Sequence, residues 1–496
     1  MTQPLVIGNR PLRITDVASV ARDRRSVTLA DSVAGQVQAG RDRVDAITTT
    51  TYGVNTGFGH LSSIRIPPQD QDQLQLNLVR SHACAVGDPL PDDVVRGMLL
   101  LLANSLAKGY SGVRMVVIDR ILTLLSSPAV PLVPSRGSVG ASGDLAPLAH
   151  CALALIGEGV VRVGGVTMPA ADAGVEPVAL RSKEGLALLN GTHLMAACGA
   201  LCCHDAQRLE TAAVAAAAVS IEALLGSHRP FDARVHDARR QPGQIRVAAT
   251  LRRLFDGSTI VESHANCARV QDPYSFRCVP QVLGAVADSF AHCRSVIERE
   301  LDAVTDNPLI FEDGAVSAGN FHGQPLSLVL DFAAIAVAEL AAFSERRSYT
   351  LLSPGPAGLP SFLAANPGLE SGLMILQYTA ASLVAELAVL AHPAGAHSIP
   401  TSAGMEDFNS MGATAALKLR ASIDHAFRVV AIELVCATQG LEHHRPLRSG
   451  RGVEAVRERV RSVVPRVDRD RSTSGELEQL ATALRSGLLD DLDGVT

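Results

Sequence analysis

The sequence predicts a mainly α-helical protein with an elongated central helical bundle, a loop-rich N-terminal part and few short strands. Long stretches place apolar residues three and four positions apart, which is the spacing of a helix that buries one face. Alanine dominates several of these stretches, and small side chains let helix axes approach closely. Neither an internal repeat nor a low-complexity linker divides the 496 residues. A helical bundle is therefore the expected architecture.

The first helices are predicted from their end signals. Asp92 and Asp93 open an apolar pattern that stops at Gly109, and acidic residues favour a helix start while glycine favours its end. The stretch from Val113 to Leu125 repeats the apolar spacing. Five longer helices are expected over residues 196–226, 280–303, 325–350, 371–391 and 411–440.

Two shorter patterns complete the secondary structure. Residues 160–166 alternate weakly in hydropathy around Gly164 and Gly165, which indicates a strand. The run Thr473-Ser-Gly-Glu476 precedes apolar residues in helical spacing and matches a capping box, in which the Thr and Glu side chains bind backbone N–H groups. A helix is therefore expected to begin there.

The chain is predicted to form one cooperative body with two parts. Residues 1–195 are the N-terminal part, and residues 196–496 are the central helical bundle and the C-terminal helices. Two segments rich in Gly, Ser and Pro, residues 52–60 and 131–147, stand apart from the helical pattern. Binding and catalytic residues are often found on loops set among rigid helices. These two segments are therefore the first candidates for a functional site.

The composition argues against several functions. Lys and Arg number 44 against 50 Asp and Glu, the formal net charge is −6, and aromatic residues make up only 3%. A nucleic-acid surface needs excess positive charge and stacking rings, so none is expected. Charged residues interrupt the most apolar stretches, so no membrane span is expected either. The N-terminus lacks a signal-peptide pattern and the nine cysteines include no C-x-x-C pair, which predicts free thiols in the cytoplasm.

The segment from Gly137 to Pro147 has unusual chemistry. A flexible surface loop is the simpler interpretation, and the spacings of a phosphate-binding loop and of a nucleophile elbow are absent. The segment contains Ala141-Ser142-Gly143, and Gly143 has no Cβ, so its amide nitrogen can approach a carbonyl carbon closely. Attack on the Ala141 carbonyl, with loss of water including the Ser142 hydroxyl, would give a methylidene-imidazolone ring. Such a ring is an electrophile made from the chain itself.

Short motifs recur in order along nearly the whole chain. They are Tyr52-Gly-Val-Asn-Thr-Gly-Phe-Gly59, Ser81-His82-Ala83, Ala141-Ser142-Gly143, Lys183-Glu-Gly-Leu-Ala-Leu-Leu-Asn-Gly-Thr192, Gln271-Asp-Pro-Tyr-Ser-Phe-Arg277, Asp306-Asn-Pro308, Gly319-Asn-Phe-His322 and the run from Ile399 to Glu406. Together they resemble the aromatic amino acid lyase and aminomutase family, and most closely its histidine-specific ammonia-lyases. The resemblance implies that ammonia is removed from an amino acid by 4-methylidene-imidazol-5-one, formed autocatalytically from Ala141, Ser142 and Gly143 with no external cofactor.

The resemblance also implies roles for single residues. Tyr52 would be the base that takes the β-proton, and its phenol pKa of about 10 would have to be shifted downward. Arg277 would bind the substrate carboxylate through its planar guanidinium, and Tyr274 would support ring formation or proton handling. Asn190 and Gln271 would orient the ring carbonyl and the substrate carboxylate. Without the motifs, Arg277 would suit a surface ion pair and Asn190 a turn.

Substrate choice is expected to depend on His82 and Glu406. Histidine-specific members of the family resemble the Ser81-His82-Ala83 motif and have Glu at the position of Glu406. A carboxylate accepts an imidazole N–H, which the rings of tyrosine and phenylalanine lack. Phe321 would form a wall against the substrate ring, although a core position suits a Phe nearly as well. The expected reaction is elimination of ammonia from L-histidine to give urocanate.

Departures near Glu406 leave other reactions open. The chain reads Gly404-Met-Glu-Asp-Phe-Asn409 where the histidine enzymes usually read Asn-Gln-Glu-Asp-His-Val. The alternative is a 2,3-aminomutase, or an ammonia-lyase acting on histidine, tyrosine or phenylalanine in a biosynthetic pathway. A non-catalytic helical scaffold is the third hypothesis. No metal-ligand spacing is present. The expected partner is a small amino acid, and the resemblance implies a homotetramer whose active sites use residues from more than one subunit.

Overall fold

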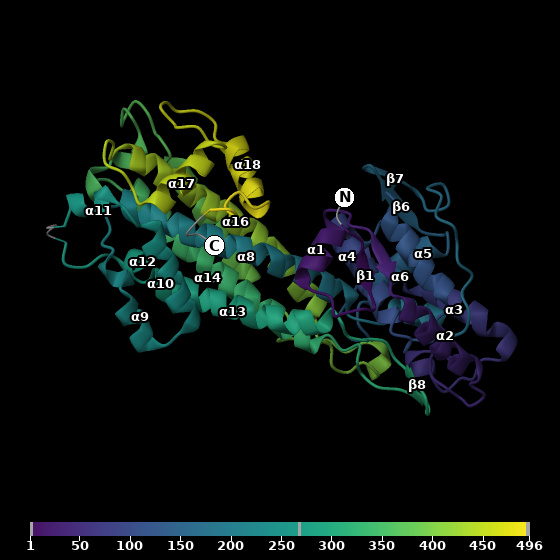
Figure 1. Cartoon of the computed structure of the whole chain (residues 1–496). Coiled ribbons are helices and arrows are strands. Elements are labelled where there is room, and N and C mark those ends of the chain that lie inside the picture. The colour runs from purple at the N-terminus through teal and green to yellow at the C-terminus, as the bar shows by residue number, and fades with distance from the viewer. Residues whose placement is uncertain (1–2, 266–268, 493–496) are drawn as a thin grey trace. The chain divides into compact units, whose positions relative to one another are not determined.

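The computed structural model describes residues 3–265 and 269–492, and it is mainly helical (Figure 1). The chain divides into two compact units. The first unit comprises Met1–His204, Arg294–Asp331 and Pro393–Leu417, and the second comprises Asp205–Cys293, Phe332–His392 and Lys418–Thr496. The chain therefore returns twice to the first unit. These units differ from the two parts expected from the sequence, residues 1–195 and 196–496. The division at residue 195 and the folding of the chain as one cooperative body stay predictions.

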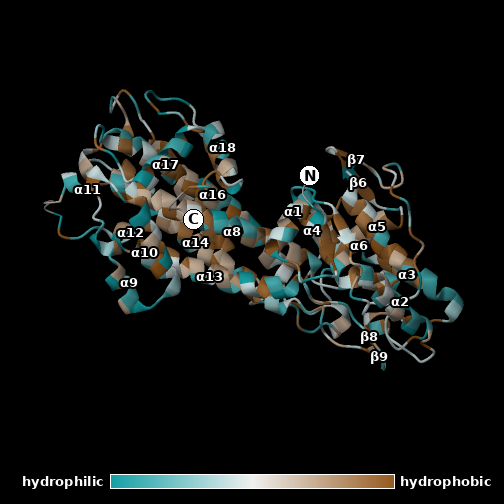
Figure 2. Ribbon diagram, in the orientation of Figure 1, coloured by the Kyte–Doolittle hydropathy of each residue, from teal (hydrophilic) through white to brown (hydrophobic). Residues whose placement is uncertain are grey.

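The first unit packs short helices around α4 (Asp92–Leu106), which contacts α1 and α5. Nearly every residue of α4 is buried, as expected for a central helix. Asp92 and Asp93 lie in its first turn and Gly109, with a φ of +79°, follows its end, so the predicted helix is confirmed. Apolar residues also gather along α5 and α6 (Figure 2). The other helices of this unit are α1 (Ile14–Ala21), α2 (Asp31–Asp45), α3 (Gln71–His82), α5 (Met115–Ser126), α6 (Leu145–Leu155) and α7 (Glu184–Leu189).

The strands are short and form four small sheets. β1 pairs with β2 in parallel. Three further sheets are antiparallel: β3 pairs with β5, β8 pairs with β9, and a three-stranded sheet has the order β4-β6-β7. The predicted strand at residues 160–166 is instead a hairpin, because Gly164 and Gly165 adopt positive φ angles at its turn. The strands are β1 (Leu5–Ile7), β2 (Val27–Leu29), β3 (Val86–Pro89), β4 (Val130–Pro131), β5 (Pro134–Arg136), β6 (Val160–Val163), β7 (Val166–Pro169), β8 (Leu309–Phe311) and β9 (Gly314–Val316).

The chain passes from one unit to the other at five points, and four long helices contain all of them except the one between His392 and Pro393. These helices are α8 (His193–Ala223), α13 (Val279–Glu300), α14 (Gln324–Leu352) and α16 (Gly412–Glu442). All four are confirmed, with ends a few residues from the predicted ones. By length and composition α14 would suffice to cross a membrane, but 61% of its most apolar window is buried inside the protein. That burial is typical of a core helix.

The second unit is a helical bundle with a buried ion pair. The Glu433 carboxylate on α16 accepts hydrogen bonds from Arg347 and Ser344 on α14 and from Ser220 on α8, at 2.5–2.8 Å. All four residues are buried, so breaking this pair would leave an uncompensated charge in the core. The pair therefore fixes the register of three helices. The other helices of this unit are α9 (Ala233–Arg239), α10 (Pro242–Leu254), α11 (Thr259–Ser263), α12 (Tyr274–Arg277), α15 (Met374–Leu390), α17 (Arg451–Arg461) and α18 (Ser474–Arg485).

The predicted capping box at the start of α18 is wrong, although the helix does begin there. Thr473 is the N-cap residue, but its side chain makes no capping hydrogen bond and its φ and ψ of −112° and −1° are close to helical. The Glu476 carboxylate accepts hydrogen bonds from the Arg471 guanidinium at 2.9 and 3.0 Å. The ion pair engages the carboxylate that a capping box would have used.

Candidate active site

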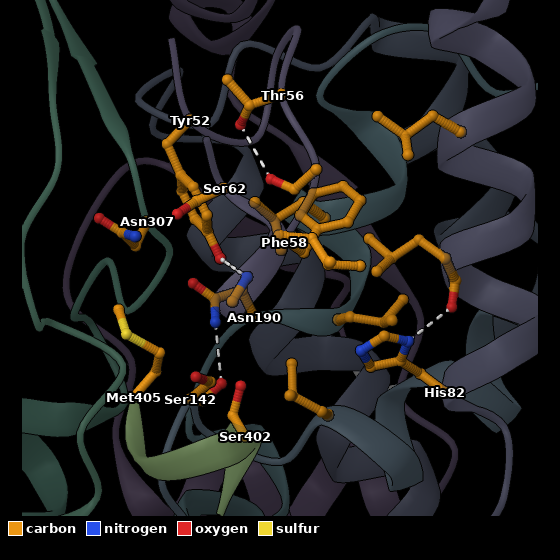
Figure 3. A pocket seen from close by; sticks show the side chains of 18 of the residues that line it. Tyr52, Thr56, Phe58, Ser62, His82, Ser142, Asn190, Asn307, Ser402 and Met405 are labelled. Atoms are coloured by element: carbon orange, nitrogen blue, oxygen red, sulfur yellow. Dashed lines mark hydrogen bonds between the residues drawn. The ribbon is translucent and has the colours of Figure 1, made fainter. Parts of the chain in front are cut away.

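A cavity of about 980 Å³ lies within the first unit. It is formed by segments far apart in the sequence: the loop before α3, the end of α3, the loop before α6, the end of α7, and the turns after β9 and before α16. Six of the predicted site residues line it, namely Tyr52, His82, Ser142, Asn190, Phe321 and Glu406. Figure 3 shows Tyr52, Asn190, Ser142 and His82 around this cavity. The structure thus brings together most of the predicted set.

The Ala-Ser-Gly segment is held against the end of α7. Gly143 and Gly191 form a β-bridge, and the Asp144 backbone N–H donates to the Gly191 carbonyl at 2.8 Å. Gly143 has a φ of +75°, and a Cβ there would lie 2.2 Å from the Gly191 oxygen. Asn190 Nδ2 donates to the Ser142 carbonyl at 2.8 Å (Figure 3). Only glycine fits at position 143. The approach of its nitrogen to the Ala141 carbonyl stays a prediction.

Asp144 anchors the same segment to the start of α8. One carboxylate oxygen accepts hydrogen bonds from the backbone N–H groups of Leu194 and Met195, at 3.0 and 3.1 Å. The other accepts from the Ser138 hydroxyl at 2.8 Å. Complete burial raises the pKa of Asp144 to about 6, although these three hydrogen bonds favour the charged form. The residue that follows the Ala-Ser-Gly motif therefore caps a helix as an anion at neutral pH.

The other end of the segment is held by the turn that precedes α16. Ser410 Oγ donates to the Gly140 carbonyl at 2.9 Å, and Met411 N–H donates to the Val139 carbonyl at 2.8 Å. Gly323 N–H adds a longer contact to Gly140, at 3.3 Å. Ser410 is fully buried. Sequence reasoning missed this second anchor, because nothing in the local pattern links residue 410 to residue 140.

The residues present fit the formation of the ring. Ala141 is buried, so water has little access to the carbonyl that the ring would consume. Ser142 Oγ donates to Glu406 Oε1 at 2.7 Å, so the hydroxyl that must leave is held in one orientation. Asn190 Oδ1 is buried and has no hydrogen-bond partner among the described residues, which leaves one acceptor beside the segment. The segment is thus fixed at both ends and at its central side chain.

The phenol of Tyr52 lies in the same cavity. Its oxygen accepts a hydrogen bond from Gly59 N–H at 3.4 Å, and its ring packs edge-on against Phe58 (Figure 3). Burial raises the pKa of Tyr52, and the negative charge of Glu406 raises it further. The predicted downward shift is therefore wrong for the chain by itself, because the cavity has an anion near the phenol and its lining includes no Lys or Arg.

The neighbours of His82 favour one tautomer. Its Nδ1 lies 2.9 Å from the Leu78 carbonyl, which can only accept, and 3.0 Å from the Ser81 hydroxyl, which can donate or accept. The carbonyl favours the tautomer with the proton on Nδ1. Burial lowers the pKa of His82, in opposition to the Leu78 carbonyl and the charge of Glu406, which both favour the cation. The ring is therefore neutral at pH 7, and Nε2 has a free lone pair. A neutral His82 can accept an N–H from a ligand in the cavity.

Glu406 is held by a residue to which sequence reasoning gave no role. Thr401 Oγ1 donates to Glu406 Oε2 at 2.6 Å, and Asn409 Nδ2 donates to Thr401 Oγ1 at 3.2 Å. Thr401 lies in the run from Ile399 to Glu406, which is one of the motifs that carry the resemblance. That motif could therefore have identified Thr401 as a candidate site residue. Asn409 lies among the departures from the usual pattern, and its role is visible only in three dimensions.

Three predicted residues lie in the second unit and do not line this cavity. Tyr274 and Arg277 are one turn apart on α12 and share a face of the helix, with the guanidinium carbon 4.8 Å from the Tyr274 ring centroid. Arg277 Nε donates to the Asp272 carbonyl at 3.0 Å. Gln271 and Arg277 line a hollow of about 700 Å³ in the second unit, and 69% of the Tyr274 side chain surface is exposed.

Among the described residues, no group of three or more His, Cys, Asp or Glu side chains is placed to hold a metal ion. No two of the eight cysteines in the described ranges form a disulfide bond with each other, and Cys267 lies outside those ranges. Phe321 lines the cavity and is partly exposed, so it is not a core residue.

Known proteins are similar to this chain over its whole length. The sequence pattern of the aromatic amino acid lyase family matches residues 12–462. A histidine ammonia-lyase of Myxococcus xanthus is 50% identical over 499 residues, which is 99% of this chain and 98% of the relative. The solved histidine ammonia-lyase of Trypanosoma cruzi is 38% identical with a TM-score of 0.91, over 98% of this chain and 94% of that one. A tyrosine aminomutase from Streptomyces globisporus is 34% identical with a TM-score of 0.93, over 98% of both chains.

Proposed function

Because the chain belongs to the aromatic amino acid lyase family, we propose that it is a histidine ammonia-lyase that eliminates ammonia from L-histidine to give urocanate. The observation that carries this proposal is the placement of Glu406 in one cavity with Ser142, Tyr52 and His82. A carboxylate and a neutral imidazole are the groups that recognise an imidazole ring.

The electrophile is 4-methylidene-imidazol-5-one, made from Ala141, Ser142 and Gly143. When formed, it supplies an acceptor for the substrate amine, which makes that amine a better leaving group. The surrounding residues hold the segment during ring formation. Asn190 binds the Ser142 carbonyl, and Asp144 fixes the segment to the positive end of α8. This step needs no group from outside the chain.

Tyr52 takes the β-proton of the substrate. Its raised pKa keeps the phenol protonated in the isolated chain at neutral pH, so the base form needs a nearby cation. The substrate ammonium and the guanidinium of Arg277 are the cations available to the assembled enzyme. Both would lower the phenol pKa when substrate binds, and the base would then be formed in the complex.

His82 and Glu406 bind the imidazole ring of the substrate. His82 Nε2 accepts an N–H, because the Leu78 carbonyl favours the tautomer with the proton on Nδ1. Only the protonated imidazolium has a second N–H, and the Glu406 carboxylate accepts it and stabilises the cationic ring. Phe321 lies along the same cavity and limits the space for the ring. A phenylalanine ring offers neither group a partner, and a tyrosine hydroxyl can donate to only one of them, which is costly for partly buried groups.

We further propose that the enzyme is a cytoplasmic homotetramer whose active site is completed by neighbouring subunits. Gln271, Tyr274 and Arg277 do not line the cavity of their own first unit. Helix α15 supports assembly, because most of its side chains are apolar and several large ones are exposed. The exposed fractions of Ile375, Tyr378 and Val389 are 57%, 62% and 74%. A second copy covering α15 would remove these side chains from water.

The experiment is to offer histidine, tyrosine and phenylalanine in turn to the purified protein. The absorbance of the conjugated product reports elimination, and amino-acid analysis reports any β-amino acid. Formation of urocanate from histidine supports the proposal, whereas preference for another amino acid contradicts it. A β-isomer as the main product would identify an aminomutase, the activity of the Streptomyces globisporus relative.

A further inference from the structure

Both oxygens of the Glu406 carboxylate are engaged in the unmodified chain. Oε1 accepts from the Ser142 hydroxyl at 2.7 Å and Oε2 accepts from the Thr401 hydroxyl at 2.6 Å. The Ser142 hydroxyl leaves as water when the ring forms, so Oε1 loses its partner. Thr401 keeps its hydroxyl and remains on Oε2. After ring formation, Thr401 is therefore the remaining side-chain donor to this carboxylate among the described residues.

Thr401 and Glu406 belong to one closed turn. Thr401 N–H donates to the Glu406 carbonyl at 2.9 Å, and Glu406 N–H donates back to the Thr401 carbonyl at 3.3 Å. Ser402 and Ala403 lie between them with φ angles of +51° and +53°, which L residues adopt rarely. The turn therefore fixes the backbone on both sides of the carboxylate-bearing residue.

Asn409 fixes the direction of the Thr401 hydroxyl. Its Nδ2 donates to Thr401 Oγ1 at 3.2 Å and to the Ile399 carbonyl at 2.5 Å, and only 1% of Asn409 is exposed. Its backbone N–H donates to Ser398 Oγ at 2.7 Å. Because Thr401 Oγ1 accepts from Asn409, its single proton is available to Glu406. The chain of donors runs from Asn409 through Thr401 to Glu406.

We propose that Thr401, oriented by Asn409, is a positioning residue that holds the Glu406 carboxylate by Oε2 and leaves Oε1 for the imidazole of the substrate. Without the Thr401 hydroxyl the Glu406 carboxylate can rotate, and a ligand that binds it must then restrict that rotation, which lowers the affinity. Only ligands that donate an N–H to Oε1 should bind more weakly for this reason. This inference rests on the proposed function, because it explains how the proposed active site selects a substrate with an imidazole ring.

The test uses Thr401→Val, which keeps the shape and removes the hydroxyl, and Thr401→Ser, which restores the hydroxyl. Thr438→Val is the matched control, because Thr438 is fully buried and its hydroxyl donates to backbone carbonyls of α16. Calorimetry measures binding of imidazolylpropionate and 3-phenylpropionate, which lack the amine and cannot react. Steady-state kinetics with histidine give KM and kcat separately, and intact mass reports ring formation.

Thr401→Val should weaken imidazolylpropionate binding about 10-fold and leave 3-phenylpropionate within about 2-fold. KM for histidine should rise more than kcat falls, and Thr401→Ser should recover most of the loss. An equal loss of affinity for both ligands in Thr401→Val would overturn the inference. So would an unchanged preference for imidazolylpropionate in a Thr401→Val protein whose mass shows complete ring formation. A wild type without preference for the imidazole ligand would contradict the histidine assignment itself, and the inference with it.

Discussion

Ser142 and Glu406 are 264 positions apart in the sequence, and the hydroxyl of the first donates to Oε1 of the second at 2.7 Å. This contact joins the residue that the proposed chemistry consumes to the residue proposed to choose the substrate. Both lie in the first unit, which the chain re-enters at Pro393. Maturation and specificity therefore depend on the same carboxylate.

Loss of two waters from the Ala-Ser-Gly segment is the first prediction. Native protein should be roughly 36 Da lighter than its sequence mass, since ring closure and dehydration each release one water. Ser142→Ala should remain at full mass and lose activity, because it has no hydroxyl to eliminate. Intact-protein mass spectrometry makes the comparison. Active wild-type protein at its full sequence mass would refute the self-formed electrophile.

Glu406→Gln should reduce histidine turnover selectively. The substitution keeps size and one acceptor but removes the charge, and a hydrogen bond to a charged group contributes about 1.5–3 kcal/mol. We expect kcat/KM for histidine to fall about 10- to 100-fold. Any weak activity on tyrosine or phenylalanine should stay level or rise. An equal fall for all three amino acids would instead indicate a general role for the carboxylate.

The pH dependence of kcat/KM should respond to the same substitution. The base form of Tyr52 is populated as pH rises through the phenol pKa, so activity should increase along that limb of the profile. The charge of Glu406 raises that pKa, and Glu406→Gln removes the charge. The rising limb should then move to lower pH. A limb that stays in place would show that Tyr52 does not sense Glu406.

Asp144→Asn should change the pH dependence of stability. The pKa of Asp144 in the folded protein is about 6, above its usual value near 4. The free energy of unfolding of the wild type should therefore fall as pH rises from about 4 to about 6, and this contribution should stay constant at higher pH. Asn keeps one oxygen for Leu194 and Met195 and cannot ionise. The unfolding free energy of the variant relative to wild type should therefore increase by about 2 kcal/mol between pH 4 and pH 7.

Thermal or urea unfolding at several pH values measures this difference. Asp42→Asn is the matched control, because it makes the same substitution at an exposed position of α2. A relative stability of Asp144→Asn that does not vary with pH would show that the buried carboxyl titrates normally.

Arg277→Lys tests the carboxylate-binding role. Lysine keeps the positive charge but lacks the planar pair of donors that matches a carboxylate. We expect kcat/KM to fall about 10-fold or more. The thermal midpoint should change little, since the Arg277 side chain contributes one hydrogen bond, to a backbone carbonyl, among those of the described residues. Unchanged kinetics would assign Arg277 a structural role.

The long helices were predictable because their apolar spacing is a local property of the sequence. The same holds for the Ala-Ser-Gly segment, since the chemistry of ring formation involves three consecutive residues. The capping box at Thr473 was wrong because Arg471, outside the motif, engages Glu476. Local patterns cannot show which of two neighbouring partners a carboxylate will choose.

The electrostatics of the site could not be predicted in the same way. The pKa of Tyr52 depends on burial and on Glu406, more than 300 positions later, so the sequence suggested a downward shift where the chain by itself has an upward one. Thr401 and Asn409 were overlooked because their roles depend on a turn with left-handed residues. Ser402 and Ala403 adopt this left-handed geometry, but neither Ser nor Ala is a residue type that predicts it.

The dependence of residues 139–140 on Ser410 and Met411 has a consequence for protein synthesis. The catalytic segment receives its second anchor from a stretch that the ribosome makes late, after most of the chain has emerged. A nascent chain that ends before residue 410 contains the whole Ala-Ser-Gly motif but lacks one of the contacts that hold it in place. Chains terminated before residue 410 should therefore accumulate without the proposed ring, and its appearance should mark polypeptides that were extended past Met411 and folded.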